Sequence, residues 1–183
     1  MSSFVHLHNH SEYSLLDGLS KIPDMVARVK DLGMDAIAIT DHGNMYGTIK
    51  FYKEALAQGI KPIIGCEIYV AKRSLQDKEA GIDSDSNHLI LLAENNEGYK
   101  NLMKIVSVSH LDGYYYKPRT DLALLEKYKK GIICLTSCVN SFVGEVLVNG
   151  NKKESETRLE KLIKIYGENY LFLELQKHIN VPP

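Results

Sequence analysis

Short runs of apolar, mostly β-branched residues alternate with longer amphipathic stretches along the chain. The short runs predict six strands, at residues 4–8, 36–40, 62–70, 88–93, 132–136 and 170–175. The longer stretches predict six helices, at residues 21–32, 46–58, 96–109, 121–129, 141–148 and 154–166. Such an alternation is typical of an α/β fold with a largely parallel sheet covered by helices, and both a barrel and a doubly wound sheet fit it.

Two stretches depart from this alternation. Residues 73–87 are polar and rich in Asp, Ser and Gly, which predicts a loop or the tip of a β-hairpin. After the last predicted strand, residues 180–183 read Asn-Val-Pro-Pro and bring no closing element. From the 183 residues we therefore expect one domain, over residues 1–183, that is incomplete at its C-terminal end.

The composition narrows the class of protein. Hydrophobic residues make up 44% of the chain and charged residues 25%, which favours a globular protein over a disordered or fibrous one. The formal net charge of −1 excludes a general cationic field, so any contact with nucleic acid has to be local. No apolar run approaches the ~20 residues that cross a bilayer, and a secretion signal is lacking. We expect a cytoplasmic protein without membrane contact.

Three histidines occupy alternate positions at the end of the first predicted strand, in His6-Leu7-His8-Asn9-His10. Alternate side chains of a strand share one face, so two or three imidazoles could converge on one ion. The alternative is an exposed polar edge with unrelated histidines, and His6, deepest in the strand, is the best candidate for a structural role. Asp17 in the next loop suits Zn²⁺ or Mn²⁺, although an Asp-Gly pair alone is usually a turn.

The next two strands also carry reactive side chains. Asp41 and His42 follow the second strand, at the edge where catalytic groups gather in parallel α/β folds. Glu67 interrupts an apolar run, and a buried acid has to be paired, protonated or bound to a metal ion. Glu67 is therefore a ligand candidate, with a salt bridge to a neighbouring Lys or Arg as the alternative.

The three cysteines show no disulfide framework. Cys138 follows the fifth strand, where a thiolate suits Zn²⁺, whereas Cys66 and Cys134 resemble buried apolar residues. Together the candidates offer more nitrogen, oxygen and sulfur ligands than one tetrahedral ion needs. They predict a site for two or three ions, which would clamp a phosphate ester and generate hydroxide from water.

These residues resemble those of a known family. The matching residues are His8-Asn9-His10, Asp17, Thr40-Asp41-His42-Gly43, Gly65-Cys66-Glu67, His88 and Cys138. Together they resemble the PHP (polymerase and histidinol phosphatase) domain. Longer strings over residues 4–18, 40–47, 61–67 and 115–119 are similar to the branch of this family found in bacterial replicative DNA polymerases.

The resemblance implies a distorted (β/α)7 barrel with a centre of two or three divalent ions, Zn²⁺ being favoured and Mn²⁺ or Mg²⁺ compatible. The implied metal ligands are His8, His10, Asp17, His42, Glu67, His88 and Cys138. Of these, His10, Glu67 and His88 are the candidates for catalysis through bound metal, and Asp41 is expected to support the ligands. The resemblance adds His88, which the strand-end argument does not select, and makes His6 a flanking residue.

The family places a final Asp-x-His pair on its last barrel strand, and the sequence stops at Pro183 before such a motif. We therefore expect a barrel truncated before its last strand and a metal site short of two ligands. The polymerase palm, thumb and fingers are not expected within residues 1–183 either. A DNA-directed DNA polymerase activity would then belong to a longer protein, and this part would be at most a metal-dependent phosphoesterase or exonuclease.

The resemblance leaves functions of different classes open. The first is a 3′-to-5′ exonuclease within a replicative polymerase. The second is a structural, metal-stabilised module that supports the polymerase and docks a separate proofreading subunit. A stand-alone phosphoesterase similar to histidinol phosphatase is disfavoured by the polymerase-type strings. Expected partners are primer-template DNA, the rest of the polymerase subunit, a proofreading exonuclease subunit and a sliding clamp.

A local contact with DNA phosphate is expected at Lys117 and Arg119, which lie beside three consecutive tyrosines at 114–116. A mixture of cations and aromatic rings suits phosphate contact and base stacking. The alternative is a surface turn fixed by Pro118, with the tyrosines packed on the barrel.

Overall fold

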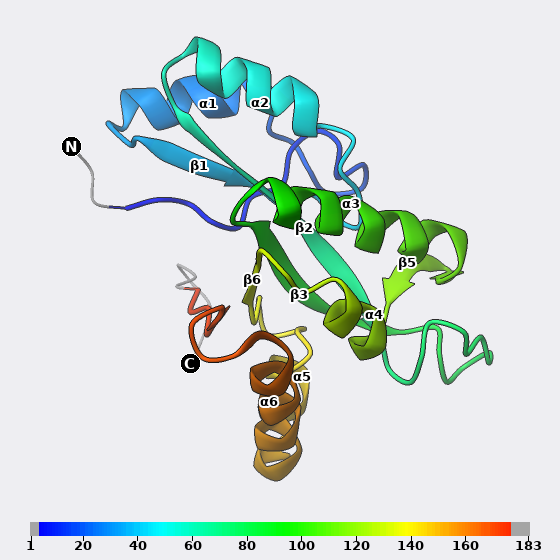
Figure 1. Cartoon of the computed structure of the whole chain (residues 1–183). Coiled ribbons are helices and arrows are strands. Elements are labelled where there is room, and N and C mark those ends of the chain that lie inside the picture. The colour runs from blue at the N-terminus through cyan, green and yellow to red at the C-terminus, as the bar shows by residue number, and fades with distance from the viewer. Residues whose placement is uncertain (1–3, 177–183) are drawn as a thin grey trace.

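A mixed sheet of seven strands forms the centre of the computed structural model, which describes residues 4–176 (Figure 1). The strands are β1 (Ala36–Ile39), β2 (Lys61–Ala71), β3 (Ser86–Ala93), β4 (Tyr114–Tyr115), β5 (Lys117–Thr120), β6 (Ile132–Leu135) and β7 (Leu171–Phe172). The helices are α1 (Ile22–Asp31), α2 (Thr48–Ala57), α3 (Asn96–Leu111), α4 (Leu122–Lys127), α5 (Gly144–Val148) and α6 (Lys152–Tyr166).

The direction of β3 distinguishes this sheet from the predicted, largely parallel one. The strand order is β4-β5-β2-β3-β6-β7, and β1 pairs with the first half of β2. β1 and β5 run parallel to β2, and β7 runs parallel to β6. β3 is antiparallel to both β2 and β6, so the prediction is wrong there. The polar stretch forms the tip of the β2–β3 hairpin, and without a helical crossover the chain returns antiparallel.

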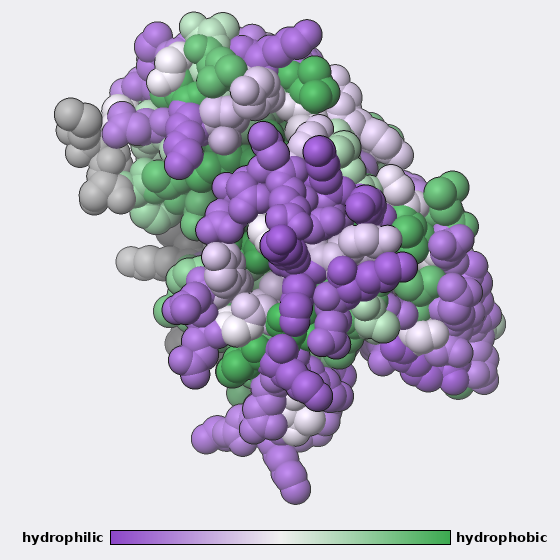
Figure 2. Space-filling model, viewed as in Figure 1, coloured by the Kyte–Doolittle hydropathy of each residue, from purple (hydrophilic) through white to green (hydrophobic). Residues whose placement is uncertain are grey.

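Apolar side chains pack on both faces of the sheet. On the inner face, Ala38, Ile90, Leu92 and Leu135 form one cluster that joins β1, β3 and β6. On the outer face, a larger cluster packs against α3, α4 and α6, while α1 and α2 cover β1. Hydrophilic residues dominate the outward surface over α3 (Figure 2). The inner cluster and the helices outside the sheet bear out the predicted distorted barrel, although β1 and β7 do not pair with each other within residues 4–176.

The helices begin and end at residues that the sequence marks. Helix α1 buries Ile22, Val26 and Val29, which recur at helical spacing, and the chain leaves it at Gly33 in a left-handed conformation with φ of 69°. The side chain of Asn95 accepts hydrogen bonds from two backbone N–H groups at the start of α3. All six predicted helices are confirmed, with ends that differ by a few residues.

The N-terminal segment, residues 4–10, lies along β1. It does not form the regular strand that was predicted for residues 4–8. The carbonyl of His6 accepts a hydrogen bond from the N–H of Ala38, and the carbonyl of Asn9 accepts one from the N–H of Thr40. A largely apolar groove of about 1190 Å³ separates this segment from the residues that follow β7. Within residues 4–176, no helix has the length and apolar character to cross a membrane.

Strand β5 holds a fully buried arginine. The sequence 117–120, Lys-Pro-Arg-Thr, reads as a polar turn, so the pattern does not predict β4 and β5. Arg119 pairs with Tyr69 of β2 in register, and its guanidinium donates to three backbone carbonyls at 2.9–3.2 Å. Those carbonyls belong to Gly113, Asp83 and Asp77. Arg119 therefore fixes the tip of the β2–β3 hairpin from inside.

Replacing Arg119 with Met should destabilise the fold by about 3 kcal/mol or more, because three buried carbonyls lose their donor. Urea denaturation followed by circular dichroism measures this loss. Arg28→Met, at an exposed position of α1, is the control and should change the free energy of unfolding by less than about 0.5 kcal/mol. Equal losses in the two variants would contradict the role of Arg119.

Candidate metal centre

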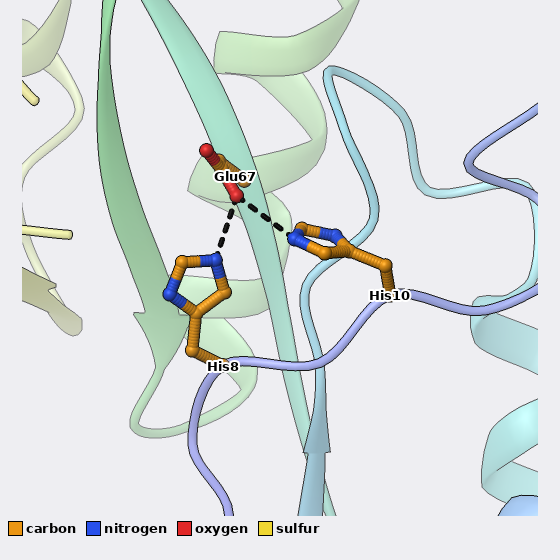
Figure 3. A group of neighbouring side chains, drawn as sticks. All are labelled: His8, His10 and Glu67. Carbon is orange, nitrogen blue, oxygen red and sulfur yellow. Dashed lines mark hydrogen bonds and ion pairs between the residues drawn. The ribbon is translucent and has the colours of Figure 1, made fainter. Parts of the chain in front are cut away.

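The carboxylate of Glu67 lies at the centre of a group of imidazoles (Figure 3). One oxygen, Oε2, is 2.7 Å from His8 Nε2 and 3.1 Å from His10 Nε2. The other, Oε1, is 2.5 Å from His88 Nδ1. The Glu67 side chain is only 2% exposed. The sequence argument that a buried acid here needs partners is confirmed, and the partners are histidines rather than Lys or Arg.

The alternation of β2 explains why Glu67 faces inward. Its neighbours Cys66 and Ile68 belong to the outer apolar cluster, under the helices. Successive side chains of a strand point to opposite faces, so Glu67 points to the inside of the barrel. The backbone of Glu67 pairs with Ile90 of β3 and forms a bridge with His42, so three segments meet at this carboxylate.

His8 and His10 reach the same carboxylate oxygen from alternate positions of the N-terminal segment. The expectation that alternate histidines converge is therefore confirmed for this pair. His6 stays outside the cluster: it is exposed, and its backbone bridges Ile37.

His42 links the cluster to Asp17. Its Nε2 lies 2.9 Å from Asp17 Oδ2, and its Nδ1 lies 3.6 Å from Glu67 Oε2. The His42 ring stacks on that of His10, with centroids 4.0 Å apart and planes 12° from parallel. The two rings therefore lie face to face beside the Glu67 carboxylate.

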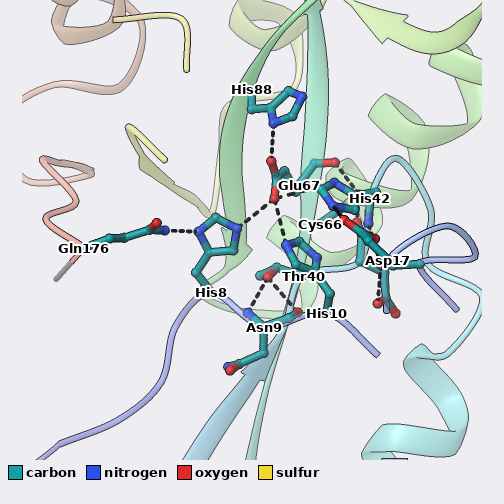
Figure 4. A network of polar contacts seen from close by, with 12 residues as sticks. His8, Asn9, His10, Asp17, Thr40, His42, Cys66, Glu67, His88 and Gln176 are labelled. Atoms are coloured by element: carbon teal, nitrogen blue, oxygen red, sulfur yellow. Dashed lines mark hydrogen bonds and ion pairs between the residues drawn. The ribbon is translucent and has the colours of Figure 1, made fainter. Parts of the chain in front are cut away.

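His88 and Cys138 complete the group of seven predicted ligands. Their side chains are hydrogen-bonded, and this bond lowers the pKa of the Cys138 thiol even though burial acts against it. Ser137, just before Cys138, has a positive φ of 64°, unusual for a non-glycine residue. Contacts thus connect all seven side chains, and Figure 4 labels the members of this group other than Cys138. Their binding of metal ions stays a prediction.

Asp41 supports the site through a loop rather than through a histidine ring. Its buried carboxylate accepts hydrogen bonds from the Ser11 N–H, the Ser11 hydroxyl and the Ser14 hydroxyl, at 2.6–2.8 Å. Ser14 Oγ in turn accepts the N–H of His42 at 3.1 Å. Asp41 therefore ties the loop that carries Asp17 to the end of β1, which fits its expected supporting role.

The charges of the cluster depend on one another. Burial alone would raise the pKa of Glu67, but hydrogen bonds from three histidines outweigh it and hold this pKa far below its usual range. Burial alone would lower the pKa of His8 and His88, but their bonds to acidic partners raise each to about 9. The pKa of His42 is lowered, mainly by burial. Without a metal ion, the carboxylate is thus held by protonated imidazoles.

The donor set fits divalent metal ions. Ligand atoms of His8, His10 and Glu67 lie within 4.8 Å of one another. Two buried ring nitrogens of the cluster, His10 Nδ1 and His42 Nδ1, have no hydrogen-bond partner among residues 4–176, and buried polar atoms normally have one. Imidazole, carboxylate and thiolate together suit Zn²⁺, and the carboxylates also suit Mn²⁺. These seven residues could therefore hold the divalent ions that the sequence predicts.

The sequence analysis did not select two polar residues that lie near the cluster. Glu174 Oε1 lies 2.8 Å from His8 Nδ1, and Gln176 Nε2 lies 3.0 Å from the same nitrogen. Glu174 interrupts the apolar sequence Leu171-Phe172-Leu173-Glu174-Leu175. An acid within an apolar run is the same signal that selects Glu67, so it was available in the sequence.

The two candidates for a DNA contact have different environments. Lys117 is exposed, and its Nζ lies 4.6 Å from the centroid of the Tyr69 ring, which packs edge-on against His88. Arg119 is fully buried and occupied by backbone carbonyls, so its guanidinium is not accessible to a phosphate. The expectation of a phosphate contact therefore rests on Lys117 alone.

The metal-free protein should lose stability as the pH rises from about 6.5 to 9. His8 and His88 have a pKa of about 9 in the folded state against 6.5 for an unperturbed histidine, so their stabilising effect is full below pH 6.5 and is lost above it. Added Zn²⁺ should act oppositely, because metal binding displaces protons and tightens with pH. Thermal unfolding across this range, with and without Zn²⁺, measures both effects. A melting temperature of the metal-free form that rises between pH 6.5 and 9 would contradict this.

Comparison with known proteins agrees with the resemblance. DNA polymerase III subunit alpha of Borreliella burgdorferi is 47% identical over 178 residues, which cover 97% of this chain. The same subunit of Treponema pallidum is 48% identical over 177 residues, which cover 96% of it. The chain spans only about 15% of the length of either relative.

Similarity to solved structures is weaker. An amidohydrolase from Chromobacterium violaceum aligns with a TM-score of 0.43 and 22% identity, over 58% of this chain and 33% of that one. A similarity of this extent adds nothing to the family assignment. The model of the PHP domain family, by contrast, matches residues 6–178. Because this match takes in nearly the whole chain, including all seven clustered side chains, the chain belongs to the PHP domain family.

Proposed function

We propose that this chain is the PHP domain of a bacterial replicative DNA polymerase and that its metal centre hydrolyses the 3′-terminal phosphodiester of DNA. The observation that supports this most is the convergence of all seven predicted ligands on and around Glu67. A structural role alone does not require so many ligands, since four suffice for a closed structural zinc site.

The residues divide into an inner and an outer part of the centre. His8, His10 and Glu67 would hold an ion at the buried end, and Asp17, with its side chain 59% exposed, lies at the solvent side. Bound divalent ions would supply Lewis acidity toward the phosphate oxygens and would acidify water for attack on phosphorus. The exposed Asp17 marks the side from which a DNA end would approach. His10, Glu67 and His88 would act in catalysis by fixing the ions.

Lys117 would bind the phosphate backbone of DNA next to the solvent side of the metal centre, where Asp17 lies. Burial, with a contribution from Glu67, raises the pKa of Tyr69 to about 12, so its ring is neutral at physiological pH. A neutral ring beneath the Lys117 ammonium favours a cation–π contact that limits where the charge can lie. From there the ammonium could contact a backbone phosphate of the DNA strand whose end enters the metal centre.

The wider context of this domain is also a proposal, and it rests on the similarity to the polymerase subunits. As part of a polymerase subunit in the cytoplasm, the domain would meet primer-template DNA, the remainder of the subunit, a sliding clamp and a separate proofreading subunit. One observation favours the alternative of a structural, metal-stabilised module. The contact between His8 and Glu174 joins residues 166 positions apart, so an ion bound at His8 would also stabilise the fold.

The decisive test measures metal content and nuclease activity on the same samples of intact protein. Wild type should contain two or more equivalents of metal and release the 3′-terminal nucleotide from a mismatched primer. His10→Ala and Glu67→Gln should lose metal, with at least a tenfold loss of release. Asp24→Asn, at an exposed position of α1, is the control. Metal without nucleotide release would leave only the structural module, and wild type without metal would refute both.

Lys117→Ala should weaken binding of the DNA substrate several-fold, seen as a higher KM, while metal content stays at the wild-type level. The reason is the loss of one phosphate contact, which should also make the salt dependence of binding less steep. Lys127→Ala, an exposed lysine at the end of α4, is the matched control. If both variants weaken DNA binding equally, Lys117 makes no specific contact with the substrate.

A further inference from the structure

We propose that Glu174, assisted by Gln176, is a positioning residue of the metal centre. Its carboxylate accepts a hydrogen bond from the N–H at His8 Nδ1, which keeps the proton on that nitrogen and leaves Nε2 of His8 free to bind a metal ion. This inference rests on the metal centre of the proposed function and adds a residue from the far end of the described chain.

The two nitrogens of His8 have separate partners. Nε2 faces Glu67 Oε2 at 2.7 Å, and Nδ1 lies 2.8 Å from Glu174 Oε1 and 3.0 Å from Gln176 Nε2. Because the Gln176 amide and a protonated Nδ1 are both donors, each bonds to Glu174 Oε1 and not to the other. A neutral imidazole carries one proton, and the nitrogen that binds a metal ion has to be the one without it. A carboxylate on Nδ1 holds the proton there, fixes the ring orientation and makes Nε2 a better donor. Glu174 and His8 thus supply the carboxylate and the histidine that a carboxylate–histidine–metal arrangement would need.

The surrounding structure holds Glu174 in place. Its backbone N–H donates to Thr136 Oγ1 at 3.0 Å, just beyond the end of β6. Thr136 is itself aligned by its N–H bond to the carbonyl of Phe172 in β7. Gln176 Nε2 donates to Glu174 Oε1 at 2.6 Å, and the Glu174 side chain is only 13% exposed. The carboxylate is therefore oriented by β6 and β7 and not only by His8.

Glu174 differs from the other acidic partners in the site. The outer nitrogen of His42 faces Asp17, and His88 is bonded to Cys138, but Asp17 and Cys138 are themselves predicted ligands. His10 Nδ1 has no hydrogen-bond partner in the described part of the chain. Among the four histidines around Glu67 there, His8 alone has an outer carboxylate that is not a predicted ligand. Within residues 4–176, Glu174 Oε2 is buried and has no hydrogen-bond partner that competes with His8 for the carboxylate.

The test is the affinity of the intact protein for Zn²⁺, measured by competition with a chelator, together with the absorption spectrum of the Co²⁺-substituted form. Glu174→Ala should weaken Zn²⁺ binding about 10–100-fold, the usual effect of losing such a partner. Glu174→Gln keeps a hydrogen-bond acceptor without the charge and should weaken it less, with an altered Co²⁺ spectrum. Glu174→Asp, which keeps the charge, should restore part of the affinity.

Glu168→Gln, an exposed glutamate in the turn before β7, is the matched control and should bind Zn²⁺ like wild type. Thermal unfolding of each metal-free variant separates positioning from a purely structural effect. If Glu174→Gln unfolds at a lower temperature but binds Zn²⁺ as wild type does, the inference is overturned while the metal centre stands. If the wild type itself binds no Zn²⁺, the proposed function fails first and the role of Glu174 with it.

Discussion

The buried charge of Glu67 is the constraint on which the rest of this structure depends. A carboxylate inside a protein is costly unless several groups compensate its charge. The free energy lost when an ionised carboxylate leaves water is far larger than the free energy gained from one hydrogen bond. The four compensating imidazoles come from three separate stretches of chain, which carry His8 and His10, His42, and His88. Each of these stretches has to reach the same end of the barrel, so the charge and the curvature of the sheet depend on each other.

The hydrophobic pattern predicted the six helices and five of the strands, but it predicted neither β4 and β5 nor the direction of β3. The reversed direction of β3 explains what the strand-end argument missed. His42 and Cys138 follow the ends of β1 and β6, as expected for a parallel sheet. His88 lies near the beginning of its strand. Because β3 is antiparallel to β6, its beginning lies beside the end of β6, where His88 bridges to Ser141. Only the family resemblance selected His88, since periodicity carries no information on strand direction.

Arg119 and Glu174 show that the type of a residue does not by itself reveal its partners in the structure. Arg119 is of a type that is mostly exposed, and its place beside tyrosines suggested a contact with DNA. Its burial depends on carbonyls of a hairpin tip some 36 residues earlier in the chain, and no local pattern reports such a partner. Glu174 gave the same signal as Glu67, an acid within an apolar run. Its partner lies at the opposite end of the sequence, which only the three-dimensional structure reveals.

The contact between His8 and Glu174 has a consequence for synthesis of the chain. The two residues are 166 positions apart. A ribosome that adds about 5–20 residues per second needs about 10–30 s to make the second after the first. Over that interval His8, His10, His42, Glu67 and His88 emerge in turn, while the acceptor for His8 Nδ1 has not yet been made. The nascent chain thus carries most of a metal-binding set before the residue that would orient its first histidine. The acceptor for the ring of His8 is made only after β7, when Glu174 has been added.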